Sequence, residues 1–295
     1  MFQGIIPAII TPFKRVPSMP VDVEGLRSNT EYLLSQGIHA IVPCGSTGES
    51  ATLNFSEHEL VIEEVVSAVG GSIPVIAGTG SNNTEEALTL TKAAARIGAD
   101  AALAISPYYN KPNRAGLIKH YTLLAECGLP IIVYNVPSRT GQNLPADLII
   151  ELAKNPDIVG VKEASGDLGQ ISQIIEGTRN LDRDIPFCVL SGDDNLTLPI
   201  LSLGGTGVIS VAANLEPARM VELYEACRSG SFVKAQHLHY ELSPLFRAMF
   251  IDTNPIPVKK AVELRGRSAG PLRLPLVELD EQKTVQLREV MSHYD

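Results

Sequence analysis

The first 226 residues of the chain alternate between short apolar segments and longer segments with helical periodicity. Apolar residues fill successive positions of the short segments, as is typical of parallel strands that are covered on both faces. The pattern predicts eight parallel strands. They are GIIPAII from Gly4, HAIVP from His39, PVIAG from Pro74, DAALAIS from Asp100, PIIVY from Pro130, DIVGVK from Asp157, PFCVL from Pro186 and GVISV from Gly207.

The segments between these strands have the spacing of amphipathic helices. SEHELVIEEVVSAV from Ser56 and NTEEALTLTKAAARIG from Asn83 place apolar residues three and four positions apart. An Asn or Ser stands near each start and a Gly near each end, and these residues are common at helix boundaries. We expect these segments to be helices that connect successive strands.

Eight β-then-α units within 226 residues fit a closed barrel, which takes roughly 250 residues. An open doubly wound sheet usually carries a Gly-x-Gly-x-x-Gly turn after its first strand, whereas TPF follows Ile10 here. After residue 226 the alternation stops, and segments 232–250, 256–264 and 280–293 have helical patterns. We expect an α/β fold, with an eightfold parallel (β/α)8 TIM barrel over residues 1–226 and a small all-helical domain over residues 227–295.

The charge distribution excludes several classes of protein. The chain has 24 Lys and Arg residues against 33 Asp and Glu residues, a formal net charge of −9, with no basic run. A nucleic-acid surface needs clustered positive charge, so we exclude nucleic acid as a partner. The uncharged stretch 195–215 is broken by one proline and three glycines, so we predict no membrane span.

The N-terminal order and the cysteines indicate a cytoplasmic protein. The first cations, Lys14 and Arg15, follow the apolar N-terminal segment, which is the wrong order for a secretory signal. Four cysteines lack any Cys-x-x-Cys spacing and are expected to be reduced thiols. They are Cys44, Cys127, Cys188 and Cys227.

The loops after the predicted strands hold the candidate functional residues, because chemistry in a barrel lies at the carboxyl ends of its strands. These loops contain glycines, hydroxyl groups, a tyrosine pair, an arginine and a lysine. They are CGSTGES from Cys44, GTGSNNT from Gly78, SPYYNKP from Ser106, NVPSRTG from Asn135, KEASGD from Lys162 and SGDDN from Ser191.

Lys162 ends the apolar run IVGV, which places its amine at the mouth of the barrel and partly out of water. Burial disfavours the ammonium form and lowers a lysine pKa. A neutral amine can attack a carbonyl group and form a Schiff base. The alternatives are an ion pair with Glu163 or Asp167, or a side chain that extends to solvent.

Tyr134 and Arg139 are candidates on the preceding strand and its loop. Tyr134 should lie beside Lys162, where a phenol can move protons; alternatively it is a core tyrosine. The Arg139 guanidinium suits a substrate carboxylate; alternatively it forms an ordinary ion pair. Residues 45–48 predict either an anion-binding turn or a simple helix cap.

Other chemistries have weaker support. His237 and His239 are two residues apart and would face different sides of a helix, so we expect no metal site. No strand-end loop contains a histidine that could act as a base for Ser46 or Ser191, which disfavours a hydrolase triad. Tyr108 and Tyr109 form an aromatic pair suited to a partner surface or a substrate contact.

Seven motifs in order resemble those of the dihydrodipicolinate synthase family, which consists of pyruvate-dependent Schiff-base enzymes. They are GSTGES, SPYYNKP, YNVPSRTG, GVKEASGD, SGDD, GVISV and NPIPVK, and the similarity spans nearly the whole chain. The resemblance implies condensation of pyruvate with aspartate β-semialdehyde in lysine and diaminopimelate biosynthesis, without metal or organic cofactor.

The resemblance also implies residue roles. Lys162 forms the imine, and Tyr134, Ser46 and Tyr109 of a neighbouring subunit relay protons. Most members have threonine where Ser46 stands. Thr47 corresponds to the residue that holds the pyruvate carboxylate and Arg139 to the one that holds the second substrate's carboxylate. Two further matched positions line the pocket with their backbone, Gly192 and Ile209.

Many members are inhibited by lysine at a cleft between subunits, and members are commonly tetramers built from tight dimers. Phe55 stands where lysine-sensitive bacterial members often have histidine, so the resemblance leaves regulation by lysine open. The matched inhibitor positions are Ser50, Ala51, His58, Asn82, Glu86 and Tyr108.

Three alternatives remain open. N-acetylneuraminate lyase and the 2-keto-3-deoxy sugar-acid aldolases share the lysine, the tyrosine and the glycine-rich loop, but generally lack the arginine matched by Arg139. A non-catalytic barrel that binds a small anion would retain the same loops. A phosphate-binding isomerase rests only on the glycine-rich loops.

Overall fold

The computed structural model of the chain describes residues 2–294. One parallel, curled sheet forms its centre, with strand order β1-β7-β6-β5-β4-β3-β2. Each strand lies in a predicted apolar segment or extends one residue beyond its end. The strands are β1 Gly4–Pro7, β2 Ile76–Gly78, β3 Ala101–Ile105, β4 Ile131–Asn135, β5 Ile158–Glu163, β6 Cys188–Ser191 and β7 Gly207–Ser210.

The sheet has seven strands, where the sequence analysis predicts eight. The segment from His39 forms only isolated parallel bridges, Val42 to Ala8 and Ile41 to Val75. Proline lacks the N–H that a continuous ladder requires. Pro7, Pro43 and Pro74 each stand directly beside a bridged residue and so interrupt the ladder. The segment nevertheless lies between β1 and β2, because the Val42 N–H donates to the Pro7 carbonyl and the Ile76 N–H donates to the Ile41 carbonyl.

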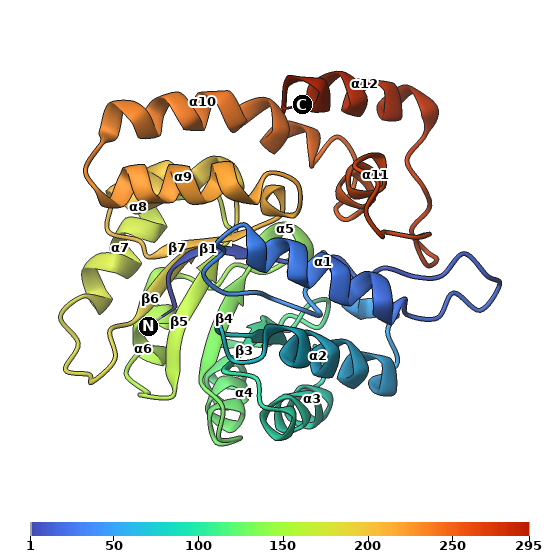
Figure 1. Cartoon of the computed structure of the whole chain (residues 1–295). Coiled ribbons are helices and arrows are strands. Elements are labelled where there is room, and N and C mark those ends of the chain that lie inside the picture. Colours follow the sequence, from blue (N-terminus) through green and yellow to red (C-terminus); the bar gives the residue numbers. More distant parts are fainter. Residues whose placement is uncertain (1, 295) are drawn as a thin grey trace.

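Helices follow most strands and cover the sheet (Figure 1). The helix predicted from Ser56 begins after Asn54, whose side chain accepts from the Glu57 N–H, and the helix predicted from Asn83 ends before Gly98. The helices are α1 Val23–Ser35, α2 Phe55–Val69, α3 Thr84–Ile97, α4 Arg114–Ala125, α5 Pro137–Thr140, α6 Ala146–Leu152, α7 Leu168–Thr178, α8 Thr197–Ser202, α9 Pro217–Arg228, α10 Phe232–Ala248, α11 Ile256–Leu264 and α12 Glu281–Met291.

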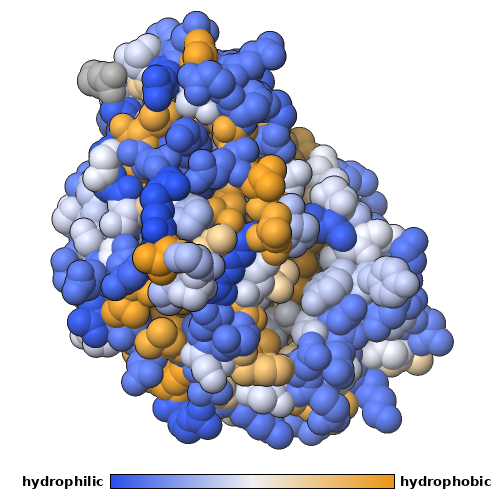
Figure 2. All heavy atoms as spheres, turned by 90° about the vertical axis from the view of Figure 1, so that its right-hand side faces the viewer, coloured by the Kyte–Doolittle hydropathy of each residue, from blue (hydrophilic) through white to orange (hydrophobic). Residues whose placement is uncertain are grey.

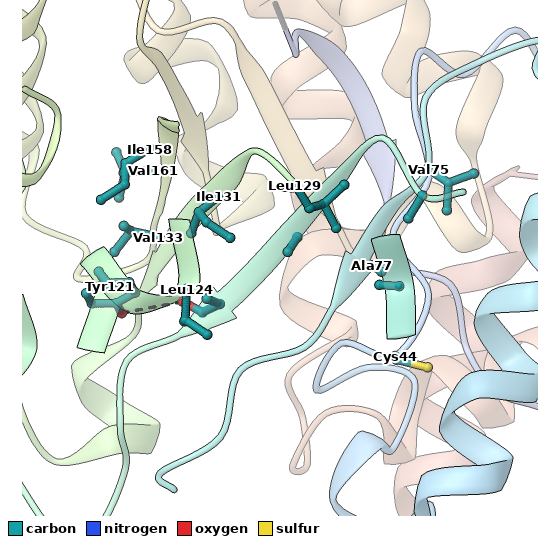
Figure 3. Close-up of a cluster of buried hydrophobic side chains, with 14 of the residues drawn as sticks. Cys44, Val75, Ala77, Tyr121, Leu124, Leu129, Ile131, Val133, Ile158 and Val161 are labelled. Atoms are coloured by element: carbon teal, nitrogen blue, oxygen red, sulfur yellow. Dashed lines mark hydrogen bonds between the residues drawn. The ribbon is translucent and has the colours of Figure 1, made fainter. Parts of the chain in front are cut away.

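Successive residues of each strand pack into two different cores, since side chains alternate across a sheet. On β4, Ile131 and Val133 face the helices and contribute to a cluster with Tyr121 and Leu124 of α4 (Figure 3). The Tyr121 hydroxyl donates to a strand carbonyl there. Tyr134, which follows Val133, belongs to a second cluster, together with residues of β1, β6 and β7. The second cluster therefore fills the inside of the curled sheet.

The three predicted C-terminal helical segments contain α10, α11 and α12. In Figure 1, α10 and α12 lie on the far side of α9 from the sheet. Their apolar cluster includes Leu238, Leu287, Tyr224 of α9 and Ile5 of β1, so it is continuous with the outside of the sheet. The division into domains at residue 226 stays a prediction.

Within residues 2–294, no helix combines the length and the apolar character needed to cross a membrane. In the same residues, His, Cys, Asp and Glu side chains form no group of three or more that could hold a metal ion. The four cysteines are free thiols.

Candidate active site

A cavity of about 730 Å³ lies at the carboxyl ends of the strands. Lys162, Tyr134, Arg139 and Ser46 all line it, together with residues of the segment between α10 and α11. Figure 2 shows the face where α1 and α2 begin, and this face is hollowed below its centre with apolar side chains around the hollow. Five of the six loops predicted at the strand ends contribute residues to the cavity lining, whereas none of residues 191–195 lines it.

Lys162 lies inside the curled sheet near the end of β5, paired in register with Tyr134 on one side and Leu190 on the other. Its side chain is only 7% exposed, and its Nζ lies 4.2 Å from the centroid of the Tyr134 ring. Burial lowers the pKa of Lys162 to about 7, the Asp194 carboxylate opposes this effect, and the Arg139 charge adds to it. A large fraction of the amine is therefore neutral near pH 7.

The two alternative partners of Lys162 are engaged elsewhere. The Glu163 carboxylate points to the opposite face of β5, where it accepts from Asn135, from Gln170 and from the Ser165 N–H. The Asp167 side chain accepts from the Gln170 N–H at the start of α7. Lys162 also does not reach solvent, which leaves its amine directed toward the cavity.

Tyr134 is buried against Lys162, and its hydroxyl group is affected by residues of two other loops. Burial raises the pKa of Tyr134, whereas the Arg139 charge and a side-chain hydrogen bond with Ser46 lower it. Ser46, Tyr134 and Lys162 therefore form a connected group of a hydroxyl, a phenol and an amine. Such a group can pass protons to and from a reacting carbonyl.

The glycine-rich turn at 45–48 presents N–H groups as well as hydroxyls. The Gly48 N–H donates to the Gly45 carbonyl and the Glu49 N–H donates to the Ser46 carbonyl. Across residues 2–294, the hydrogen bonds include none that is donated by the main-chain N–H of Ser46 or Thr47. These two groups are available to an anion.

Thr47 is buried and is not among the residues that line the cavity. Its Oγ1 accepts a 2.9 Å hydrogen bond from Nδ2 of Asn254. Arg139, on the short helix α5, donates from Nη2 to the main-chain carbonyl of Asn254 at 3.0 Å. Among the described residues, no ion pair includes Arg139, so its charge is available to a ligand.

Gly192 and Ile209 are not among the residues that line the cavity. A Cβ atom on Gly192 would stand 3.2 Å from Cε of Lys162 and 2.6 Å from Cβ of Ala164. Glycine at this position therefore leaves room for the lysine side chain. Ile209 is buried in the inner cluster of the sheet.

Tyr109 is 87% exposed, has a left-handed backbone with φ of 72°, and does not line the cavity. Asn82 also lies outside the lining, and its carbonyl accepts from the Asn110 side chain. The cavity lining does contain Phe55. Five matched inhibitor positions also line it, namely Ser50, Ala51, His58, Glu86 and Tyr108.

Asp194 and Asn254 are two further residues near the site, and the sequence alone predicts no role for either. Asp194 is buried, and burial raises the pKa of its carboxyl to about 6 although Oδ2 accepts from two backbone N–H groups. The loop SGDDN contains Asp194, and the motif NPIPVK begins with Asn254. Both motifs are visible in the sequence, but only the tertiary contacts connect them to Lys162 and Thr47.

A curled parallel α/β sheet with a buried, partly neutral lysine at a strand end defines a class of proteins suited to imine chemistry. Comparison with known proteins narrows this class. A family model described as the Dihydrodipicolinate synthetase family matches residues 1–294. The chain belongs to this family.

Individual relatives agree over the full length. A 4-hydroxy-tetrahydrodipicolinate synthase from Methanoculleus marisnigri is 66% identical over 294 residues, which cover 100% of both chains. The crystal structure of dihydrodipicolinate synthase from Aquifex aeolicus has a TM-score of 0.95 at 46% identity, covering 99% of this chain and 98% of that one. A lysine-bound structure of the enzyme from Cyanidioschyzon merolae has a TM-score of 0.94 at 42% identity, with the same coverage.

Proposed function

We propose that the chain is a 4-hydroxy-tetrahydrodipicolinate synthase that condenses pyruvate with L-aspartate semialdehyde. The observation that carries this proposal is the buried Lys162 amine, with a pKa of about 7, in contact with the Tyr134 ring. The free charge of Arg139 in the same cavity and the names of the full-length relatives support it. The reaction belongs to lysine and diaminopimelate biosynthesis.

The reaction begins when neutral Nζ of Lys162 attacks the ketone carbon of pyruvate. Loss of water gives an iminium ion, and loss of a proton from the methyl carbon gives an enamine. The enamine carbon then attacks the aldehyde carbon of the second substrate, whose oxygen gains a proton. Finally the substrate amine attacks the imine carbon, which closes the ring and releases Lys162. The residues themselves supply the chemistry, without metal or organic cofactor.

Protons move through Ser46, Tyr134 and a partner subunit's tyrosine. The Ser46 side chain, which lowers the pKa of Tyr134, supports the first link. Tyr109 is exposed and does not line the cavity of its own subunit, which suits a contribution to a neighbouring site. The relay therefore requires a dimer, and we propose a tetramer of two such dimers.

Two different groups of residues hold the carboxylates of the two substrates. The turn that contains Ser46 and Thr47 offers unused N–H groups and the Thr47 hydroxyl to pyruvate. Arg139 holds the carboxylate of aspartate semialdehyde at the cavity entrance. Gly192 and Ile209 shape the wall behind the imine.

The closure of the barrel and the C-terminal helices are proposed to be as in the rest of the family. The segment 41–42 completes a closed eightfold barrel between β1 and β2, which its bridges to both strands support. Helices α10 to α12 form a small C-terminal domain, and the enzyme acts in the cytoplasm.

Reductive trapping tests the central step. Pyruvate and borohydride should add one reduced pyruvate adduct to the intact protein, and Lys162→Ala should show none. A protein that binds pyruvate without a covalent adduct would instead be the non-catalytic anion-binding barrel. An adduct on another lysine would contradict the assigned nucleophile.

Arg139 separates the synthase from the sugar-acid aldolases. Arg139→Gln should lose most turnover with aspartate semialdehyde while still trapping pyruvate. Cleavage of N-acetylneuraminate or of a 2-keto-3-deoxy sugar acid by the wild type, without synthase turnover, would assign the chain to those relatives instead. Competition by inorganic phosphate at millimolar concentration would favour a phosphate-binding isomerase.

Free lysine is the proposed effector, held by the part of the cavity that contains His58, Glu86 and Tyr108. The lysine-bound relative from Cyanidioschyzon merolae supports it. Glu86→Ala should then abolish inhibition by lysine and leave turnover without lysine intact. Unchanged turnover of the wild type at saturating lysine would refute this effector.

A further inference from the structure

Asn254 contacts both of the side chains to which the proposed function assigns a substrate carboxylate. Its Nδ2 donates to Oγ1 of Thr47 at 2.9 Å, and its main-chain carbonyl accepts from Nη2 of Arg139 at 3.0 Å. Asn254 itself lines the cavity and is 6% exposed. A single residue between α10 and α11 thus joins the two ends of the site.

The contact with Thr47 fixes the direction of its hydroxyl proton. A threonine hydroxyl has one donor and two acceptor positions, whereas an amide NH₂ group can only donate. Because Asn254 donates to Oγ1, the Thr47 proton has to point to a different acceptor. A carboxylate bound at the neighbouring N–H groups of Ser46 and Thr47 is such an acceptor.

A second contact holds the same loop against the same C-terminal segment. Lys259 of α11 donates to Oε1 of Glu49 at 2.7 Å, and both side chains are almost fully buried. Glu49 follows Thr47 by two residues and Lys259 follows Asn254 by five. The loop is therefore attached at two points, to α11 and to the segment just before it, so Asn254 meets Thr47 in a fixed geometry.

The oxygen atom of the Asn254 side-chain amide argues against a purely structural role of this residue. Oδ1 of Asn254 is buried and has no hydrogen-bond partner among the described residues. An unpaired buried acceptor lowers stability. A smaller or apolar side chain would avoid this loss, so the donor to Thr47 is the feature that an asparagine adds here.

We infer that Asn254 is a positioning residue that orients the Thr47 hydroxyl toward the pyruvate carboxylate and holds the Arg139 guanidinium at the cavity entrance. This inference rests on the proposed function. It adds that the segment after α10 belongs to the active site and acts mainly on pyruvate affinity through its side chain.

The experiment compares Asn254→Ala and Asn254→Asp with the wild type in steady-state synthase assays. Asn254→Ala should raise the pyruvate KM up to about tenfold, the value of roughly one hydrogen bond. Its KM for aspartate semialdehyde should change less than about twofold, because the backbone carbonyl that meets Arg139 remains. Asn254→Asp should raise the pyruvate KM further, since its carboxylate accepts the Thr47 proton and repels the substrate.

Asn29→Ala is the matched control. Asn29 is also buried, and its Nδ2 donates to the carbonyl of Ser268, which does not line the cavity. Both KM values should stay at the wild-type level in this variant. The isosteric Asn254→Asp variant decides the outcome if Asn254→Ala does not fold.

Three results separate the possible failures. Wild-type pyruvate KM in both Asn254 variants, or a smaller effect of aspartate than of alanine, would overturn the inference. An equal rise of both KM values in Asn254→Ala would show a general structural role and would also overturn it. Absence of the borohydride adduct in the wild type would refute the proposed function itself, whereas trapping at saturating pyruvate should persist in all three variants.

Discussion

The amine nitrogen of Lys162 lies 4.2 Å from the centroid of the Tyr134 ring, at the paired position of the neighbouring parallel strand. The face of an aromatic ring favours a cation, whereas burial favours the neutral amine. Burial dominates, since the pKa of Lys162 is lowered to about 7. The enzyme therefore holds a nucleophile that does not need a strong base to activate it.

Imine formation should depend on pH through Lys162. With a pKa of about 7, the neutral fraction of the amine rises about tenfold between pH 6 and pH 8. The initial rate of pyruvate trapping with cyanoborohydride, followed by intact mass, should rise accordingly with a midpoint near pH 7. A midpoint above pH 9 would show that the amine is not desolvated in solution.

Replacement of Asp194 should shift this profile to lower pH. The Asp194 carboxylate raises the pKa of Lys162, and its own pKa of about 6 leaves it mostly ionised at pH 7. Asp194→Asn removes the charge and keeps an oxygen for the Val211 and Ala212 N–H groups. The same trapping assay measures the midpoint, and a shift to higher pH would contradict the electrostatic role of Asp194.

Lys162→Met should abolish trapping and stabilise the fold. The lysine binds a proton below about pH 10.5 when unfolded but releases it above about pH 7 when folded. Wild-type stability therefore falls as pH drops from about 10.5 to 7, and the variant lacks this loss. Thermal unfolding should show a Tm increase of a few degrees at pH 6.5, at about 2–4 °C per kcal/mol, and a smaller one at pH 9.5. A lower Tm at both pH values would contradict the prediction.

Replacement of Lys259, a buried lysine with an ion-pair partner, should destabilise the fold, whereas replacement of Lys162 should stabilise it. Lys259 is paired with Glu49, so Lys259→Met leaves a buried carboxylate without its cation. The free energy of unfolding should fall by about 3–5 kcal/mol. Urea denaturation measures this value, and the double variant Glu49→Gln with Lys259→Met should recover much of the loss. An unchanged unfolding midpoint in the single variant would refute the coupling.

Gly192→Ala should impair the reaction through contact with Lys162. The added methyl group would stand 3.2 Å from Cε of Lys162 and 2.6 Å from the Ala164 side chain, which is too close. We expect kcat to fall at least about tenfold, since small displacements of reacting groups have large effects. Gly116→Ala on α4 is the control, because its new Cβ would meet its neighbours at 3.4 Å. Equal activity of both variants would show that the lysine tolerates displacement.

Part of the site follows from local sequence alone. Consecutive apolar runs predict neighbouring parallel strands, and the carboxyl ends of such strands meet at one edge, which brings Tyr134 and Lys162 together. The strand predicted from His39 forms only isolated bridges, because an apolar run does not reveal that prolines at positions 7, 43 and 74 interrupt its ladder. Periodicity reports which residues are buried, but continuous pairing also needs N–H groups on both sides.

The sequence by itself determined the strands, their order of connection and the amine, phenol and guanidinium at their ends. Only the tertiary structure decided that Asn254 meets Thr47 across 207 residues and that Lys259 meets Glu49 across 210. The physical reason is range: hydrophobic periodicity is a property of neighbouring residues, whereas a hydrogen bond between distant segments depends on how the packed chain brings them together.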